Sequence, residues 1–116
     1  IDLHGALLDG VNFTNAFMLG CKLSGASLTR ADLRWANFGD CRIVDADLTG
    51  ADLFHTTFDT AVLNGSLFVE TVMFGTNLNE VQAENADFSN SFMKDVAFEE
   101  ANVAGSRFVN SFMQRA

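Results

Sequence analysis

The 116-residue chain has no proline and no tyrosine, only two cysteines, and only seven lysine and arginine residues. The shortage of basic side chains argues against direct nucleic-acid binding, because these side chains supply most of the affinity for phosphate backbones. Fifteen acidic residues give a formal net charge of −8. Two cysteines are too few for a disulfide scaffold, and no Cys-x-x-Cys pair indicates a zinc or redox site.

Long apolar runs are also missing. No segment approaches the roughly 20 apolar residues that a transmembrane helix needs, and the first twenty residues lack the basic and apolar regions of a signal peptide. Hydrophobic residues nevertheless make up 48% of the chain, which excludes a disordered segment. We therefore expect one soluble domain covering residues 1–116 without membrane contact, and a cytoplasmic location is favoured although the sequence names no compartment.

A five-residue repeat runs through the whole chain. In rows of five starting at Ile1, the third position is large and apolar in 22 of 23 rows, with Ala83 as the exception. The first position is Ala, Ser, Thr or Cys in 19 rows, and the fifth position holds eight of the nine glycines. This spacing fits neither an amphipathic helix nor a long strand. It predicts short extended segments joined by corners whose last residue has positive φ.

A single turn of such a chain cannot bury its own inward side chains. Successive turns are therefore expected to stack as a solenoid, with about 4.8 Å between neighbouring coils. The absence of proline agrees with this, because nearly every backbone N–H is needed for ladder pairing. Ala83 is the one small residue at a third position, so we expect either a cavity there or inward movement of Phe68 or Phe88.

Several rows share one motif, including ADLRW from Ala31, ADLTG from Ala46 and ADFSN from Ala86. These rows resemble the A(D/N)Lxx signature of the pentapeptide-repeat family, and the resemblance covers the whole chain. It implies an all-β fold, a right-handed quadrilateral parallel β-helix with four pentapeptides per coil. The 23 rows then give nearly six coils and a rod about 28 Å long.

With four pentapeptides per coil, residues 20 apart share a face. One face, here called the aromatic face, carries most of the outward aromatic side chains: Trp35, Phe54, Phe74, Phe92 and Phe112. Its positive and negative charges cancel. Large exposed apolar patches usually mark interfaces, so we predict that this face binds a protein partner or a second copy of the chain. Cover by another segment of the same protein is the alternative.

The neighbouring face, here called the acidic face, carries no lysine or arginine. Its carboxylates belong to Asp40, Asp59, Glu80, Glu99 and Glu100. Solvation is the simplest role for them. The family resemblance implies a second function, because some members resemble duplex DNA in shape and charge and bind type II topoisomerases. The alternative prediction is therefore an acidic DNA-mimic inhibitor of such an enzyme, for example DNA gyrase.

No catalytic or metal-binding constellation is present in the sequence. His4 and His55 are expected more than two coils apart, and no phosphate loop, zinc spacing or Ser-His-Asp triad occurs. Glu80 and Glu100 should lie close together, but calcium requires six to eight oxygen ligands. We therefore predict that the protein is not an enzyme and uses no cofactor, metal or small-molecule substrate.

Two further expectations concern the cysteines and the chain ends. Cys21 and Cys41 both occupy first positions and are 20 residues apart, so they should stack in adjacent coils with Cα atoms about 4.8 Å apart. We expect them to be reduced, small buried residues. Neither end departs from the repeat to form a polar cap, so we also expect capping segments to be missing from the sequence given.

Overall fold

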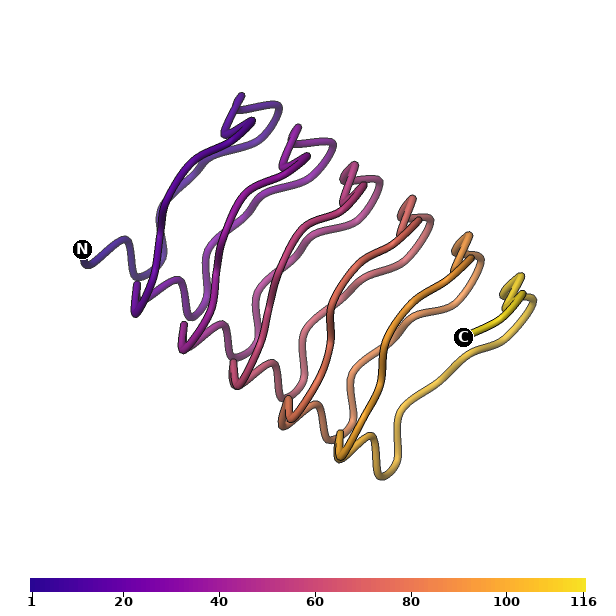
Figure 1. The fold of residues 1–116 in the computed structure, drawn as a ribbon. Helices are drawn as coiled ribbons and strands as arrows, with labels where there is room; N and C mark the ends of the chain where they lie inside the picture. The colour runs from indigo at the N-terminus through magenta and orange to yellow at the C-terminus, as the bar shows by residue number, and fades with distance from the viewer.

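The computed structural model describes residues 1–116 as one continuous solenoid (Figure 1). It contains no helix, and no strand longer than a single bridge residue, because each pentapeptide pairs only through its second position and turns at its fourth and fifth. Parallel bridges join residues 20 apart, from Asp2↔Lys22 to Phe92↔Phe112. Four pentapeptides therefore make one coil, and the predicted right-handed quadrilateral β-helix is confirmed.

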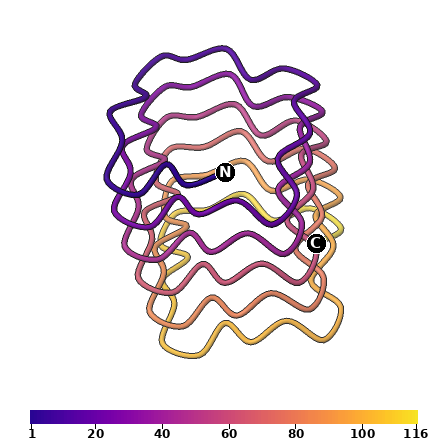
Figure 2. The ribbon, with the colours of Figure 1, turned by 90° about the vertical axis from the view of Figure 1, so that its left-hand side faces the viewer.

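The coils stack with little lateral change, so that their outlines repeat along the axis (Figure 2). The two termini lie at opposite ends of the stack (Figure 1). The longest extent of the Cα trace is 32 Å and the other two are 23 and 20 Å, close to the expected rod. No helix in the structure is long and apolar enough to cross a membrane.

The corners have the predicted backbone conformation. Every fifth position has positive φ, from 66° to 73° at the glycines and from 53° to 62° at the other residues. At many corners the N–H of the next residue closes the turn on the third-position carbonyl, as Ala6 does on Leu3 at 3.0 Å, whereas the Ala46 N–H donates to Ser66 Oγ at 3.1 Å. Because the coils on either side hold each corner in place, even Trp35 adopts this left-handed conformation, with φ of 62°.

The structure explains the preference for Asp or Asn at the second position. The fourth-position N–H takes no part in the backbone ladder. Where the second residue is Asp or Asn, its side-chain oxygen accepts this hydrogen bond instead. Examples are Thr49 N–H to Asp47 at 3.0 Å and Asn79 N–H to Asn77 at 2.8 Å. The motif residue is therefore a local cap for the turn.

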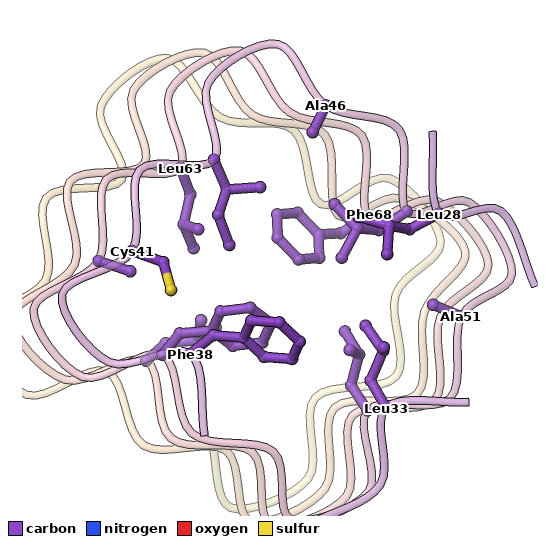
Figure 3. Packing of buried hydrophobic residues seen from close by; sticks show 14 of the residues in the cluster. Leu28, Leu33, Phe38, Cys41, Ala46, Ala51, Leu63 and Phe68 are labelled. Carbon is purple, nitrogen blue, oxygen red and sulfur yellow. The ribbon is translucent and has the colours of Figure 1, made fainter. Parts of the chain in front are cut away.

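Large third-position side chains fill the interior, as Figure 3 shows for Phe38 and Phe68. Phe68 stacks on Phe88 with ring centroids 5.0 Å apart. Ala83 is also a third-position residue and is fully buried.

Hydroxyl groups at first positions are also buried, and each finds a partner. Thr56 donates to the Leu33 carbonyl at 2.7 Å, and Thr76 donates to the Leu53 carbonyl at 2.6 Å. Buried polar groups normally require such partners. These residues therefore contribute both packing and hydrogen bonds to the interior.

Candidate functional site

The aromatic face is formed by the third pentapeptide of each coil. Bridges connect Asp52 to Val72, Val72 to Phe92, and Phe92 to Phe112 in one column. Among the predicted binding residues, Trp35 is 55% exposed and Phe92 and Phe112 are each 53% exposed. Phe54 and Phe74 are half-buried. The structure thus places all five predicted residues along one face with unequal exposure.

The rings of this face form two clusters. In the first cluster the Trp35 indole stacks on the His55 imidazole at 4.5 Å, and the edge of Phe54 contacts both rings at 5.7 and 4.4 Å. In the second cluster Phe92 lies 6.3 Å from Phe74 and 6.4 Å from Phe112. The division arises because Phe54 turns toward the corner, where the indole and the imidazole lie.

His55 is a site residue that the sequence predictions missed. It follows Trp35 in the same corner column, and Gly75 follows His55. A Cβ atom at Gly75 would lie only 2.5 Å from His55 Cε1, so the glycine provides room for the imidazole. The 20-residue spacing could have identified His55, because it places this residue next to Trp35 in the neighbouring coil. Left-handed backbone at bulky residues costs about 1–2 kcal/mol per residue, and the stacked rings offset part of this cost.

Charged residues on the aromatic face are paired at both of its ends. Arg34 donates to both carboxylate oxygens of Asp32, at 2.9 and 2.7 Å, and lies 3.8 Å from Asp52. These hydrogen bonds lower the pKa of Asp32 to about 2. Near the other end Arg115 donates to Asp95 at 2.6 Å, which lowers the pKa of that carboxyl group. Phe92 and Phe112 lie in the same two pentapeptides as Asp95 and Arg115.

The acidic face differs because its carboxylates have no cationic partner within salt-bridge distance. All five predicted residues are exposed: Asp40, Asp59, Glu80, Glu99 and Glu100. Thr60 donates a hydrogen bond to Asp40. The same face also carries Phe17, which is 72% exposed. No group of three or more His, Cys, Asp or Glu residues in the structure could hold a metal ion.

Comparison with protein families gives one result. The family model described as pentapeptide repeats matches the chain in 8 copies, over residues 1–40, 31–68, 51–90 and 76–115. A comparison with curated protein sequences finds no match.

Several solved structures share the fold. HetL, a pentapeptide repeat protein involved in heterocyst differentiation regulation in the cyanobacterium Nostoc sp. strain PCC 7120, aligns with a TM-score of 0.73 and 23% identity. The alignment covers 99% of this chain and 58% of HetL, so the chain spans little more than half of that protein.

Two further structures extend the comparison. The pentapeptide repeat protein alr5209 from Nostoc PCC 7120 has a TM-score of 0.72 and 23% identity, over 88% of this chain and 84% of alr5209. Full-length QnrB1, a plasmid-mediated fluoroquinolone resistance protein, has a TM-score of 0.56 and 21% identity, over 99% of this chain and 73% of QnrB1. At these identities the likeness is one of fold.

Proposed function

Because the chain belongs to the pentapeptide-repeat family, we propose that it is a non-enzymatic protein-binding or scaffolding module that uses its aromatic face. The observation that carries this proposal is the exposure of Trp35, Phe92 and Phe112 on one face whose charges are balanced. Its partner is a protein or a second copy of the chain, not a nucleic acid, a membrane or a small molecule.

The layout of the face supports this function. Protein interfaces combine an apolar, aromatic centre with a polar rim, and aromatic residues are frequent among the contacts that contribute most to affinity. Here the rings share the face with the Arg34 and Arg115 ion pairs. Since these charges already have partners, binding at this face leaves neither of them unpaired.

The face is somewhat smaller than one side of an interface of standard size. With Cα dimensions of 32 × 23 × 20 Å, one long face measures roughly 640 Å², against about 800 Å² per partner in an interface of standard size. A partner therefore has to cover most of the face, including both ring clusters. Substitutions in either cluster should weaken binding.

The test compares a Phe92→Ser/Phe112→Ser double variant with a matched Phe17→Ser control. Phe17 is even more exposed but lies on the acidic face, so its substitution makes the same chemical change elsewhere. We expect the double variant to lose self-association in sedimentation equilibrium, or capture of the partner by the tagged intact chain, while the control retains both. The proposal fails if the double variant loses only stability and keeps its association state and partners.

A second candidate function uses the acidic face. Its five carboxylates are exposed and unpaired with cations, which suits a DNA-mimic binder and inhibitor of a type II topoisomerase such as DNA gyrase. The chain also shares the fold of QnrB1. Charge reversal at Asp40, Glu80 and Glu100 should abolish any inhibition of gyrase supercoiling, whereas the Phe92→Ser/Phe112→Ser variant should leave it unchanged. The opposite pattern would favour the aromatic face.

A further inference from the structure

Two thiols meet inside the second and third coils. Cys21 and Cys41 lie one residue before Lys22 and Arg42, and the parallel bridge between those two residues holds the cysteines in register. Their Sγ atoms are 2.6 Å apart, both residues are only 1% exposed, and they are not bonded. The two cysteines are stacked in adjacent coils as predicted, and their sulfur atoms lie closer than the packing of two separate thiols requires.

The surroundings direct the two sulfur atoms toward one another. The Cys21 N–H donates to Cys41 Sγ at 3.2 Å, and the Cys41 thiol donates to the Met18 carbonyl at 2.9 Å. The next residue of the column is Ala61, which offers no further reactive group. Figure 3 shows the Cys41 sulfur pointing into the interior. Each thiol therefore has one potential reaction partner, the other thiol.

We propose that Cys21 and Cys41 are a dithiol oxidation site that accepts a low-molecular-weight disulfide, of the oxidised glutathione class, and closes to a bond between two coils. In the first step a cysteine thiolate attacks the reagent, forming a mixed disulfide and releasing one thiol. In the second step the other cysteine attacks the mixed disulfide and releases the second thiol. The two cysteines together lose two protons and two electrons, and the reagent is reduced to two thiols.

Either cysteine can be the first nucleophile, because either sulfur can be the donor in the hydrogen bond between them and the thiolate is the reactive form of both. Because both thiols are buried, the reagent reaches them only when neighbouring coils separate locally, and the reaction is slow in the folded chain.

The bond would link one complete coil. The two cysteines are 20 residues apart, and closing a loop of this length reduces the conformational freedom of the unfolded chain. Oxidation should therefore stabilise the second and third coils against separation. This effect is independent of the proposed protein-binding function.

The experiment treats the folded chain with oxidised glutathione and follows its intact mass. We expect a decrease of about 2 Da for the two lost thiol hydrogens, together with a higher denaturation midpoint that returns to its original value on reduction. The matched control is Cys41→Ala, because alanine is the commonest first-position residue in this chain. This variant should retain only a mixed disulfide and show no increase in midpoint.

Two results would overturn the proposal. One is a chain that remains in the dithiol or mixed-disulfide form under conditions in which it stays folded, although its thiols react once it is denatured. The other is an internal disulfide that lowers the denaturation midpoint, because the coils would then be distorted by the bond.

Discussion

Replacement of Phe58 by alanine tests whether the inward rings stabilise the coils. Phe58 is fully buried, stacks on Phe38 at 5.6 Å and contacts the edge of Phe68 at 5.9 Å. Truncation removes both ring contacts and leaves a cavity. The backbone cannot close over it, because the Phe58 N–H is held by the Asn77 carbonyl of the next coil at 2.8 Å. We expect the free energy of unfolding to fall by about 3–5 kcal/mol.

Urea denaturation followed by circular dichroism measures this loss. The control is Phe92→Ala, which removes the same ring from a position that is 53% exposed and should cost about 1 kcal/mol. The dependence of the unfolding free energy on urea should stay the same in both variants, so that the shift in midpoint reports stability. A Phe58→Ala loss no larger than that of the control would refute the assignment of the core.

Three other outcomes follow from the aromatic face. Arg34 lowers the pKa of Asp32 to about 2. The ion pair therefore contributes stability above pH about 4, and this contribution is lost as the pH falls toward 2. The free energy of unfolding measured against pH should show this loss in the parent chain but not in Asp32→Asn. Gly75→Ala should displace His55 and change the fluorescence of the chain's single tryptophan, and an unchanged spectrum would contradict the stacked arrangement. Phe92→Asn should raise the urea midpoint while weakening partner binding, and a lower midpoint would show that its ring contacts outweigh a restored turn cap.

The coil geometry could be predicted because it follows from a short local period. The third positions alone identify the inward column, and the glycines at fifth positions, such as Gly5 and Gly50, mark corners with positive φ. Each of these features depends on residues within one pentapeptide, so no long-range contact has to be known. The number of pentapeptides per coil came from the family resemblance, and with it the column of every residue, including Cys21 and Cys41.

The ring contacts could not be predicted, because a column assignment does not determine side-chain rotamers. Phe54 and Phe74 are adjacent in one column, yet Phe54 contacts His55 and Phe74 contacts Phe92. Likewise Trp35 is more than half exposed although its indole covers an imidazole. The side-chain rotamers of these residues depend on residues 20 positions away and on the space left by Gly75.

On the aromatic face, as on the other three faces, some turns lack the local cap of the second residue. Where the second residue is aspartate, as in Asp52, its carboxylate accepts the N–H of the fourth residue, here Phe54 at 3.1 Å. Where the second residue is Phe92, no cap exists, and the Lys94 N–H has no acceptor within the chain. A missing cap costs stability, and ring contacts with about half of the ring in solvent recover only part of it. The Phe92→Ser/Phe112→Ser variant separates the two roles of these rings, because rings that only stabilise the solenoid would leave the association state and partners of the variant unchanged.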